Sequence, residues 1–269
     1  MDTSNPENLS KEERKRIKAL KKAEKDAAIA KESYDLTSKV TVLCVRFGNR
    51  YGIEYVERLR NMVARNMTVP YEFVCLTDSN HVIPGVRNIT QPNAGYQKGW
   101  WHKVHMFDPG LPISGRILYF DLDVVIHANI DKLATVWTSD FLGIRDFNRK
   151  FYPSWQYLNS SVMAWNHGEQ SHVWRDFKRN PSDAMRLQGD QDWIWKTSRD
   201  RIKWWPLEWI QSYKWEIRRR EDLTIHNGKR RFKNSLHNVN IHPECCVTVF
   251  HGDPKPQDVT DQFVVDNWR

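Results

Sequence analysis

The sequence contains no long apolar run and no segment that resembles a secretion signal. No stretch approaches the ~20 consecutive apolar residues that a membrane-spanning helix needs, and the N-terminal residues are charged rather than apolar. These absences argue against an integral membrane protein and against a secreted one. We therefore expect a cytoplasmic protein, with peripheral attachment to a membrane as the alternative.

Cysteine is scarce, and its spacing indicates neither disulfides nor a zinc site. The four cysteines are Cys44, Cys75, Cys245 and Cys246, and no pair has the C-x-x-C spacing. Small disulfide-stabilised domains and zinc-binding modules need denser or paired cysteines. We expect reduced and buried thiols.

The composition is that of a packed protein with a polar exterior. Of 269 residues, 40% are hydrophobic and 12% aromatic, while the mean hydropathy is -0.71. This length suits one α/β domain. Residues 1–37 are mostly Lys, Glu and Ala, which predicts a charged helical or flexible tail, followed by one domain over residues 38–269.

Positive charge is concentrated near the C-terminal end. The formal net charge is +8, and residues 201–233 contain ten lysines and arginines against four acids. Such a stretch is either a solvated basic face or a site for an anionic acceptor or a membrane surface. No nucleic-acid-binding motif accompanies it, so nucleic acid is not an expected partner. Within this stretch Trp204, Trp205 and Trp209 are candidate contacts for an acceptor sugar.

The domain begins with an alternation of strand and helix patterns. A β-branched run at 39–47 predicts a buried strand, 53–66 an amphipathic helix and 71–78 a second strand. This order implies parallel strands, with ligands at their carboxyl ends. Further strands are expected at 115–126, 140–147, 160–166 and 247–252, and helices at 99–107, 167–180 and 191–200.

Two aspartates end the apolar run "RILYF". In an extended strand Asp121 and Asp123 would point to the same side. Two carboxylates that face one cavity repel each other unless a cation lies between them. Oxygen ligands favour a hard divalent ion, Mn²⁺ or Mg²⁺, which commonly also binds substrate phosphates. The pair therefore predicts a metal site that holds a diphosphate.

A set of short motifs in a fixed order extends this hypothesis. The segments "GWWHKVHMF", "GRILYFDLDVVIHANIDKL", "LNSSVMAWNHG", "GDQDWIW" and "FHGDPKP" follow one another along the chain. Together they resemble the metal-dependent glycosyltransferases of the GT-A fold, and most of all the family 8 group that includes glycogenin and the lipooligosaccharide galactosyltransferases. The resemblance implies a single Rossmann-like α/β domain, with a mixed central sheet flanked by helices. It also implies retaining transfer of a hexose from a UDP-sugar to a carbohydrate or another hydroxyl acceptor.

The resemblance assigns the metal and nucleotide contacts. Asp121 and Asp123 match the D-x-D whose carboxylates hold the metal, and Asp121 also lies near the donor ribose. Lys103 matches a lysine that contacts the donor sugar. Tyr51 matches a tyrosine that stacks on the uracil ring.

The same resemblance assigns the sugar pocket and the reaction centre. Asn159 and Ser160 match a segment that lines the sugar pocket. Asp190, Gln191 and Asp192 match the segment beside the anomeric carbon, where they are the candidate catalytic residues.

The C-terminal motif departs from the family pattern. Gly252 and Lys255 match a G-x-x-K-P segment whose lysine holds the diphosphate. The metal-binding histidine of the family would stand at Val249, but this chain has His251 directly before the glycine. His251 is the candidate third metal ligand, displaced by two residues. Ser161 also replaces a glycine that is usual in family 8.

Two other functions fit parts of the pattern. "YFDLDVV" also resembles the aspartyl-phosphatase signature, in which Asp121 would be a nucleophile and Asp123 a general acid. That signature usually lies on the first strand, whereas at least two predicted strands precede it here. A nucleotide-sugar or glycan-binding module without catalysis is the other alternative.

Overall fold

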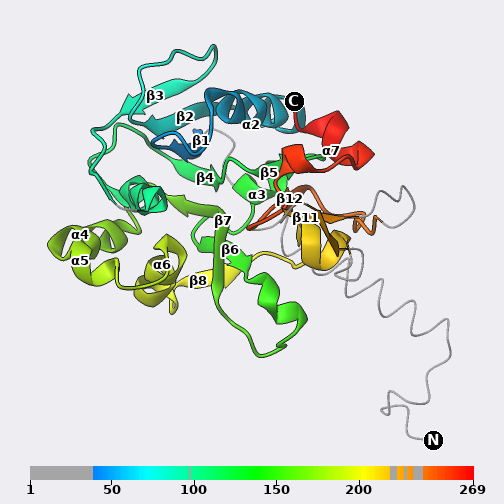
Figure 1. Cartoon of the computed structure of the whole chain (residues 1–269). Coiled ribbons are helices and arrows are strands. Elements are labelled where there is room, and N and C mark those ends of the chain that lie inside the picture. The colour runs from blue at the N-terminus through cyan, green and yellow to red at the C-terminus, as the bar shows by residue number, and fades with distance from the viewer. Residues whose placement is uncertain (1–38, 97, 219–222, 227–228, 233–238) are drawn as a thin grey trace, which may run out of the picture.

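The computed structural model describes residues 39–96, 98–218, 223–226, 229–232 and 239–269, so the expected tail at 1–37 lies outside the described residues. A seven-stranded mixed sheet crosses the domain in the order β3-β2-β1-β4-β7-β6-β8 (Figure 1). Strands β3, β2, β1 and β4 are parallel, and β7 is antiparallel to both of its neighbours. The strands are β1 (Val40–Arg46), β2 (Tyr71–Thr77), β3 (Arg87–Thr90), β4 (Arg116–Phe120), β6 (Phe141–Arg145), β7 (Leu158–Asn166) and β8 (Ile202–Trp204).

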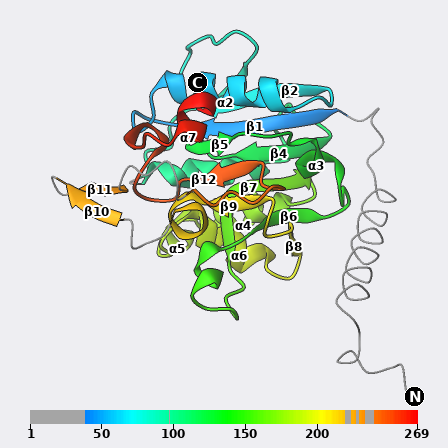
Figure 2. The same cartoon turned by 90° about the vertical axis from the view of Figure 1, so that its right-hand side faces the viewer.

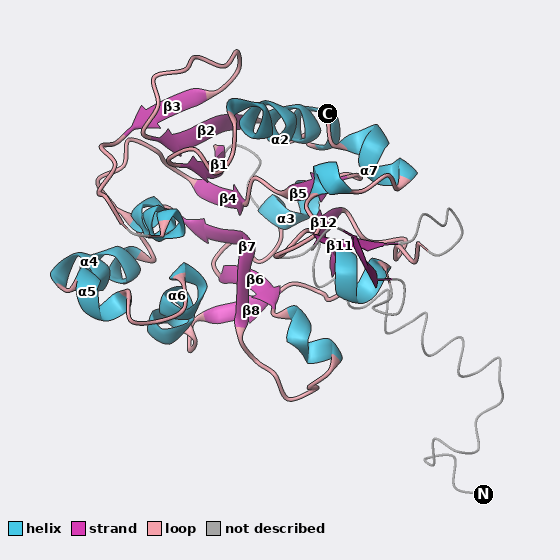
Figure 3. Cartoon of the chain, viewed as in Figure 1, coloured by secondary structure: helices cyan, strands magenta, loops and turns pink. Residues whose placement is uncertain are grey.

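Helices cover both faces of this sheet (Figure 3). Helix α2 (Ile53–Asn66) packs on one face because its apolar residues recur at helical spacing, from Tyr55 and Val56 to Met62 and Val63. The other face is covered by the 3₁₀ helix η2 (Gly99–Phe107), α4 (Ser171–Arg179) and α6 (Asp190–Ser198). Shorter helical segments are α3 (Asp131–Thr135), η3 (Phe147–Lys150), α5 (Pro181–Ala184), η4 (Tyr213–Ile217), η6 (Pro256–Asp258) and α7 (Gln262–Asn267).

Two small strand groups complete the fold. Strands β5 (Val124–Ile126), β12 (Val247–Val249) and β9 (Ile210–Ser212) form a second sheet in the order β5-β12-β9. Figure 2 shows the antiparallel hairpin of β10 (Leu223–His226) and β11 (Lys229–Phe232) standing away from both sheets. None of the helices that the structure describes is long and apolar enough to cross a membrane.

The predicted strand over 115–126 is wrong in one respect, because it is two strands in two different sheets. Strand β4 ends at Phe120, and the backbone N–H of Asp121 still donates to the Ser161 carbonyl at 2.8 Å. The chain then turns through residues 121–123 and enters β5 in the second sheet. The two aspartates therefore lie at the passage between the sheets and not within a continuous strand.

A β-bulge interrupts the pairing of β7 with β6 near the beginning of β7. Gly143 of β6 pairs with Met163, but the next residue, Ile144, pairs with Asn159, so β7 contributes extra residues over one step of β6. Residues 160–162 consequently lack a partner on β6. The bulge releases this part of the strand for other contacts.

Candidate active site

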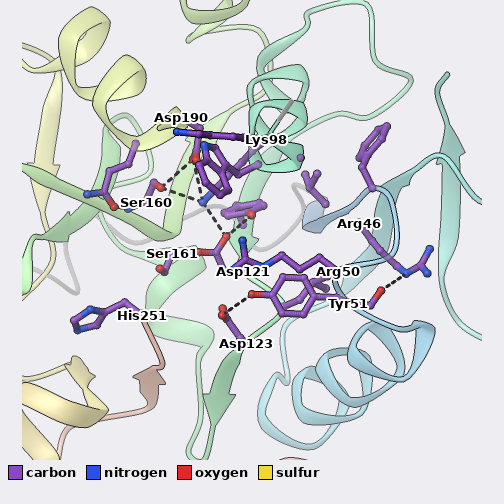
Figure 4. Close-up of a pocket in the computed structure, with 18 of the residues that line it drawn as sticks. Arg46, Arg50, Tyr51, Lys98, Asp121, Asp123, Ser160, Ser161, Asp190 and His251 are labelled. Carbon is purple, nitrogen blue, oxygen red and sulfur yellow. Dashed lines mark hydrogen bonds and ion pairs between the residues drawn. The ribbon is translucent and has the colours of Figure 1, made fainter. Parts of the chain in front are cut away.

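One cavity of about 540 Å³ lies at the carboxyl ends of the parallel strands β1 and β4 (Figure 4). It brings together chain segments that are up to 210 residues apart in sequence, from Val45 to Lys255. Eleven of the twelve expected site residues line it: Tyr51, Lys103, Asp121, Asp123, Asn159, Ser160, Asp190, Gln191, His251, Gly252 and Lys255. Asp192 lies on α6 and is not among the lining residues.

Lys103 is buried between two acids at the centre of the cavity. Its Nζ lies 2.8 Å from Asp121 Oδ1 and 3.4 Å from Asp190 Oδ2, and it donates to Ser160 Oγ at 3.0 Å. The hydroxyl of Tyr119 donates to the same oxygen of Asp121 at 2.6 Å. Residues from η2, β4, β7 and α6 thus meet at one ammonium group.

The charges in this cluster shift each other's protonation. Burial favours the neutral amine, but the carboxylates of Asp121 and Asp190 outweigh it and raise the pKa of Lys103. Burial would raise the pKa of Asp121, yet the Lys103 ammonium holds that pKa below its usual value. Burial raises the pKa of Asp190, and Lys103 offsets only part of this effect. Lys103 and Asp121 are therefore charged, while Asp190 is the acid that takes up a proton more readily.

Asp123 has its own pair of partners. Tyr51 Oη donates to Asp123 Oδ2 at 2.9 Å, and Lys255 Nζ forms an ion pair with the same oxygen. Lys255 Nζ also donates to the Phe250 carbonyl at 3.3 Å. The turn that delivers Lys255 passes through Gly252, whose φ of +69° is a conformation that residues with a side chain rarely adopt.

His251 lines the cavity from the side of the second sheet. Its Nε2 is hydrogen-bonded to Ser212 Oγ at 2.7 Å, and its ring stacks on Phe147 with centroids 5.2 Å apart. Burial, with the nearby cations of Lys214 and Lys255, lowers the pKa of His251 to about 3. The ring is therefore neutral, which is the form that binds metals.

The residues that the structure describes contain no preformed group of three His, Cys, Asp or Glu side chains able to hold a metal ion. The role of His251 as a third ligand stays a prediction. The contacts described above engage Oδ1 of Asp121 and Oδ2 of Asp123. Both aspartates line the same cavity, and their carboxylate oxygens are the kind of ligand that hard divalent cations prefer.

The bulged start of β7 forms one wall of the cavity. The backbone N–H of Ser160, which has no partner on β6, donates to Gln191 Oε1 at 3.1 Å. The Ser160 hydroxyl donates to Asp190 Oδ2 at 3.3 Å, and Ser161 N donates to Asn159 Oδ1 at 3.1 Å. The first turn of α6 is thereby fixed against β7.

The cavity is also lined by residues that were not among the expected site residues, including Arg50, Lys98, Trp100 and Tyr119. Tyr119 could have been found, because it is two residues before Asp121 and shares its side of the strand. Trp100 lies between two cations, with Arg50 Cζ 5.9 Å and Lys98 Nζ 5.3 Å from its ring centroid. That contact joins the segment after β1 to η2, so only the tertiary structure reveals it.

The basic stretch at 201–233 does not form a single exposed face over the side chains that the structure describes. Arg218 is buried and pairs with Asp261 at 3.0 Å. Lys203 pairs with Asp140 at 2.8 Å on the edge strand β8. Arg219, Arg220 and the side chains at 223–233 lie outside the described part of the chain. The proposed role of the stretch in binding an anionic acceptor or a membrane is untested.

Two of the three tryptophans expected to contact an acceptor belong to the core. Trp205 and Trp209 are 3% and 5% exposed and pack in the cluster beneath the second sheet. Only Trp204 is partly exposed. Sequence position within a charged stretch did not distinguish buried rings from surface rings.

The cysteine prediction is confirmed, since all four thiols are free and buried.

Comparisons with known proteins support the fold. No protein-family model matches the chain, and no curated protein matches it in sequence. Among solved structures it is similar to the glycosyltransferase GlyE of Streptococcus pneumoniae TIGR4, with a TM-score of 0.57 and 11% identity over 85% of this chain and 61% of that chain. The apo form of GlyE gives a TM-score of 0.56 and 12% identity, covering 86% and 61%.

A third structure is that of the galactosyltransferase LgtC in complex with donor and acceptor sugar analogs. Its TM-score is 0.54 and its identity 13%, over 85% of this chain and 95% of that chain. At such low identity these similarities establish the fold alone. The expected GT-A fold, with a mixed central sheet flanked by helices, is confirmed.

Proposed function

We propose that this protein is a metal-dependent, retaining glycosyltransferase that moves a hexose from a UDP-sugar to a hydroxyl acceptor. One observation carries the proposal: in a GT-A fold, a single cavity collects the Asp121 and Asp123 pair, the expected lysines Lys103 and Lys255, and the Asp190 and Gln191 pair from separate segments. The motif resemblance supports the same function, and it favours the family 8 group.

Mn²⁺ or Mg²⁺ is the proposed cofactor, held by Asp121 and Asp123 with His251 as the candidate third ligand. When bound, such an ion neutralises negative charge on the leaving diphosphate. Oxygen ligands of this kind favour hard ions. The neutral ring of His251 is compatible with this role.

The lysines supply the remaining positive charge. Lys255, on the turn after β12, contacts Asp123 and is placed to bind the diphosphate beside it. Lys103 lies between Asp121 and Asp190, where it can reach a sugar hydroxyl or a phosphate oxygen. Both lysines line the same cavity as Asp121 and Asp123, and cations held in this way would stabilise the negative charge that grows on the leaving diphosphate.

In the proposed reaction the bond between the anomeric carbon and the β-phosphate oxygen breaks, and UDP leaves with the bonding pair. The acceptor hydroxyl oxygen bonds to the anomeric carbon on the same face, and its proton passes to the departing diphosphate. Asp190 and Gln191, which line the same cavity, are the proposed groups whose oxygens stabilise the electron-poor sugar ring. Asp192 has no part in this proposal because it lies outside the cavity lining.

The direct test is donor turnover. The full chain is incubated with Mn²⁺ and a panel of UDP-sugars, and free UDP is measured with and without chelator. We expect chelator-sensitive UDP release from UDP-glucose or UDP-galactose. Absence of both UDP-sugar binding and UDP release would overturn the proposal, and binding without release would favour the non-catalytic module.

The phosphatase hypothesis gains no support from the structure. The segment "GDPKPQD", residues 252–258, also resembles an acidic motif of the aspartyl-phosphatases, and Asp258 is its last acid. Asp258 accepts a hydrogen bond from the Lys255 backbone N–H at 3.0 Å and does not line the cavity. Hydrolysis of p-nitrophenyl phosphate, with no turnover of UDP-sugars, would favour the phosphatase hypothesis.

A further inference from the structure

A row of aromatic side chains lies on the surface beside the cavity. Successive ring centroids are 6.2 Å apart from Tyr152 to Trp155, 4.5 Å to Tyr157, 5.6 Å to Trp195 and 5.8 Å to Trp204. We call these five residues the aromatic ridge. Tyr152 and Tyr157 are 61% and 45% exposed, and the three tryptophans are partly exposed. Exposed rings gathered in this way indicate a binding surface.

The ridge is built on a firmly held connection between β6 and β7. Arg145 Nε donates to the Trp155 carbonyl at 2.7 Å, and the same guanidinium donates to the Pro153 carbonyl. Backbone bonds join Asp146 N to the Tyr157 carbonyl and Trp155 N to the Tyr152 carbonyl, both at 2.8 Å. The rings are therefore ordered before any ligand arrives, which lowers the entropy lost on binding.

The ridge starts at the edge of the proposed reaction centre. Tyr157 is two residues before the cavity residue Asn159, a spacing of about 7 Å along an extended chain. Trp195 is four residues after the cavity residue Gln191, about one turn along α6. Two different elements thus lead from the cavity wall to the same pair of rings, Tyr157 and Trp195, which are in contact.

The chemistry of the surface favours carbohydrate over other ligands. Residues 151–157, "FYPSWQY", contain no charged side chain and no Leu, Ile or Val. Of the lysines next to the other ridge residues, Lys203 is paired with Asp140 at 2.8 Å, and Lys196 Nζ lies 5.8 Å from the ring centroid of Trp193, which is not part of the ridge. Nucleic-acid surfaces interleave such rings with Lys and Arg. Flat aromatic faces with polar edges suit the C–H faces and hydroxyl rims of pyranose rings.

We propose that the aromatic ridge binds the acceptor, and that this acceptor is an uncharged oligosaccharide several sugar units long. Its terminal sugar would enter the cavity beside Asn159 and Gln191, and the following rings would stack on Tyr157, Trp195 and the rings beyond. This inference rests on the proposed glycosyltransferase function and adds the substrate class to it.

The test separates acceptor binding from donor binding. The full chain and the Tyr152→Ala/Tyr157→Ala double variant are applied to a printed array of neutral and sialylated oligosaccharides, and affinity for the best neutral glycan is measured by calorimetry. Both tyrosines are well exposed, so the fold should persist. We expect about a tenfold or greater loss of affinity in the double variant, with unchanged binding of UDP and Mn²⁺.

Phe151→Ala is the matched control. Phe151 lies on the same connection and is 47% exposed, but its ring packs against Trp215 and not against the ridge. It should bind the glycan as the parent does.

Several results would overturn the inference: no neutral glycan bound by the parent, equal binding by parent and double variant, or binding confined to sialylated glycans. A double variant that changes the oligomeric state in light scattering would make the ridge an interface between copies of the chain. If the parent binds a neutral glycan but does not bind UDP, the result would instead count against the proposed donor function.

Discussion

At the scale of single residues, Lys103 is the side chain on which the site's electrostatics depend most. It is buried and touches Asp121, Asp190 and Ser160, so three walls of the cavity are joined through one ammonium group. A buried charge of this kind is retained only where its partners remain in place. Its removal would leave the buried carboxylate of Asp190 and the partly buried carboxylate of Asp121 without a shared cation.

Lys103→Met should therefore destabilise the metal-free protein, by about 3–5 kcal/mol at neutral pH. Without the ammonium, burial and mutual repulsion raise the folded-state pKa of both Asp121 and Asp190. Acids with a raised folded pKa contribute stability at low pH that is lost as pH rises, so the deficit should be smaller at pH 4.5 than at pH 7.5. Urea denaturation of the parent and the variant at the two pH values measures this loss in the free energy of unfolding.

The second variant Lys103→Met/Asp190→Asn serves as the control, because it removes the unpaired acid and should recover part of the lost stability. A deficit that does not change with pH or with the second substitution would show that Lys103 matters for packing alone.

Asp123→Asn tests the metal clamp. The amide keeps the shape but loses the charge that would hold a divalent ion, so Mn²⁺-dependent release of UDP should fall by about 100-fold or more. Asp253→Asn is the control, since Asp253 is exposed and does not line the cavity. A variant that keeps the parent's response to Mn²⁺ titration would remove Asp123 from the ligand set.

At the scale of secondary-structure elements, the sequence predicted the segments whose pattern is local. The strand at 39–47, the helix at 53–66 and the strand at 71–78 appear as β1, α2 and β2 within a residue or so, because their apolar periodicity is strong. The division of 115–126 into β4 and β5 was not predictable, since it depends on which sheet each half joins. The β-bulge at Gly143 and the ring contacts of the aromatic ridge also depend on tertiary contacts, which the sequence pattern does not reveal.

The connection between β6 and β7 yields a prediction at this scale. Arg145→Ala removes the guanidinium that holds the carbonyls of Pro153 and Trp155, a loss of roughly 1–2 kcal/mol of local stability. Amide hydrogen exchange over residues 147–157 should then become about tenfold faster, while exchange in α2 stays as in the parent. Gln156→Ala, an exposed change on the same connection, should leave exchange as it is. Equal rates in Arg145→Ala and the parent would mean that the guanidinium does not hold the connection.

At the scale of the whole molecule, the site joins both ends of the described domain. Tyr51, shortly after the first strand, and Lys255, near the C-terminus, meet at the same oxygen of Asp123. The family resemblance assigned both residues to the donor site but did not predict their shared contact with Asp123. Eleven of the twelve expected residues line the cavity. The exception, Asp192, is adjacent in sequence to Gln191 but turns away from it, as the helical period of α6 requires.

A ligand that contacts both ends should stabilise the entire domain. UDP with Mn²⁺ at about 100 times its dissociation constant should raise the free energy of unfolding by about 2.7 kcal/mol. Chemical denaturation with and without the pair measures this, and AMP with Mn²⁺ is the control. Because the site spans the domain, the whole transition should move as one; a shift confined to part of the unfolding curve would contradict this.

The β-bulge at Gly143 has a consequence for how such a protein can diversify. On one side of it, Gly143 and Met163 belong to the register of the central sheet, which also fixes β4 and Asp121. On the other side, the short pairing of Ile144 and Arg145 with Asn159 and Leu158 leads into the connection that bears the rings. Insertions or deletions in that connection leave the core register unchanged. If the ridge binds the acceptor as proposed, lineages could change the acceptor surface while they keep the strands that hold Asp121.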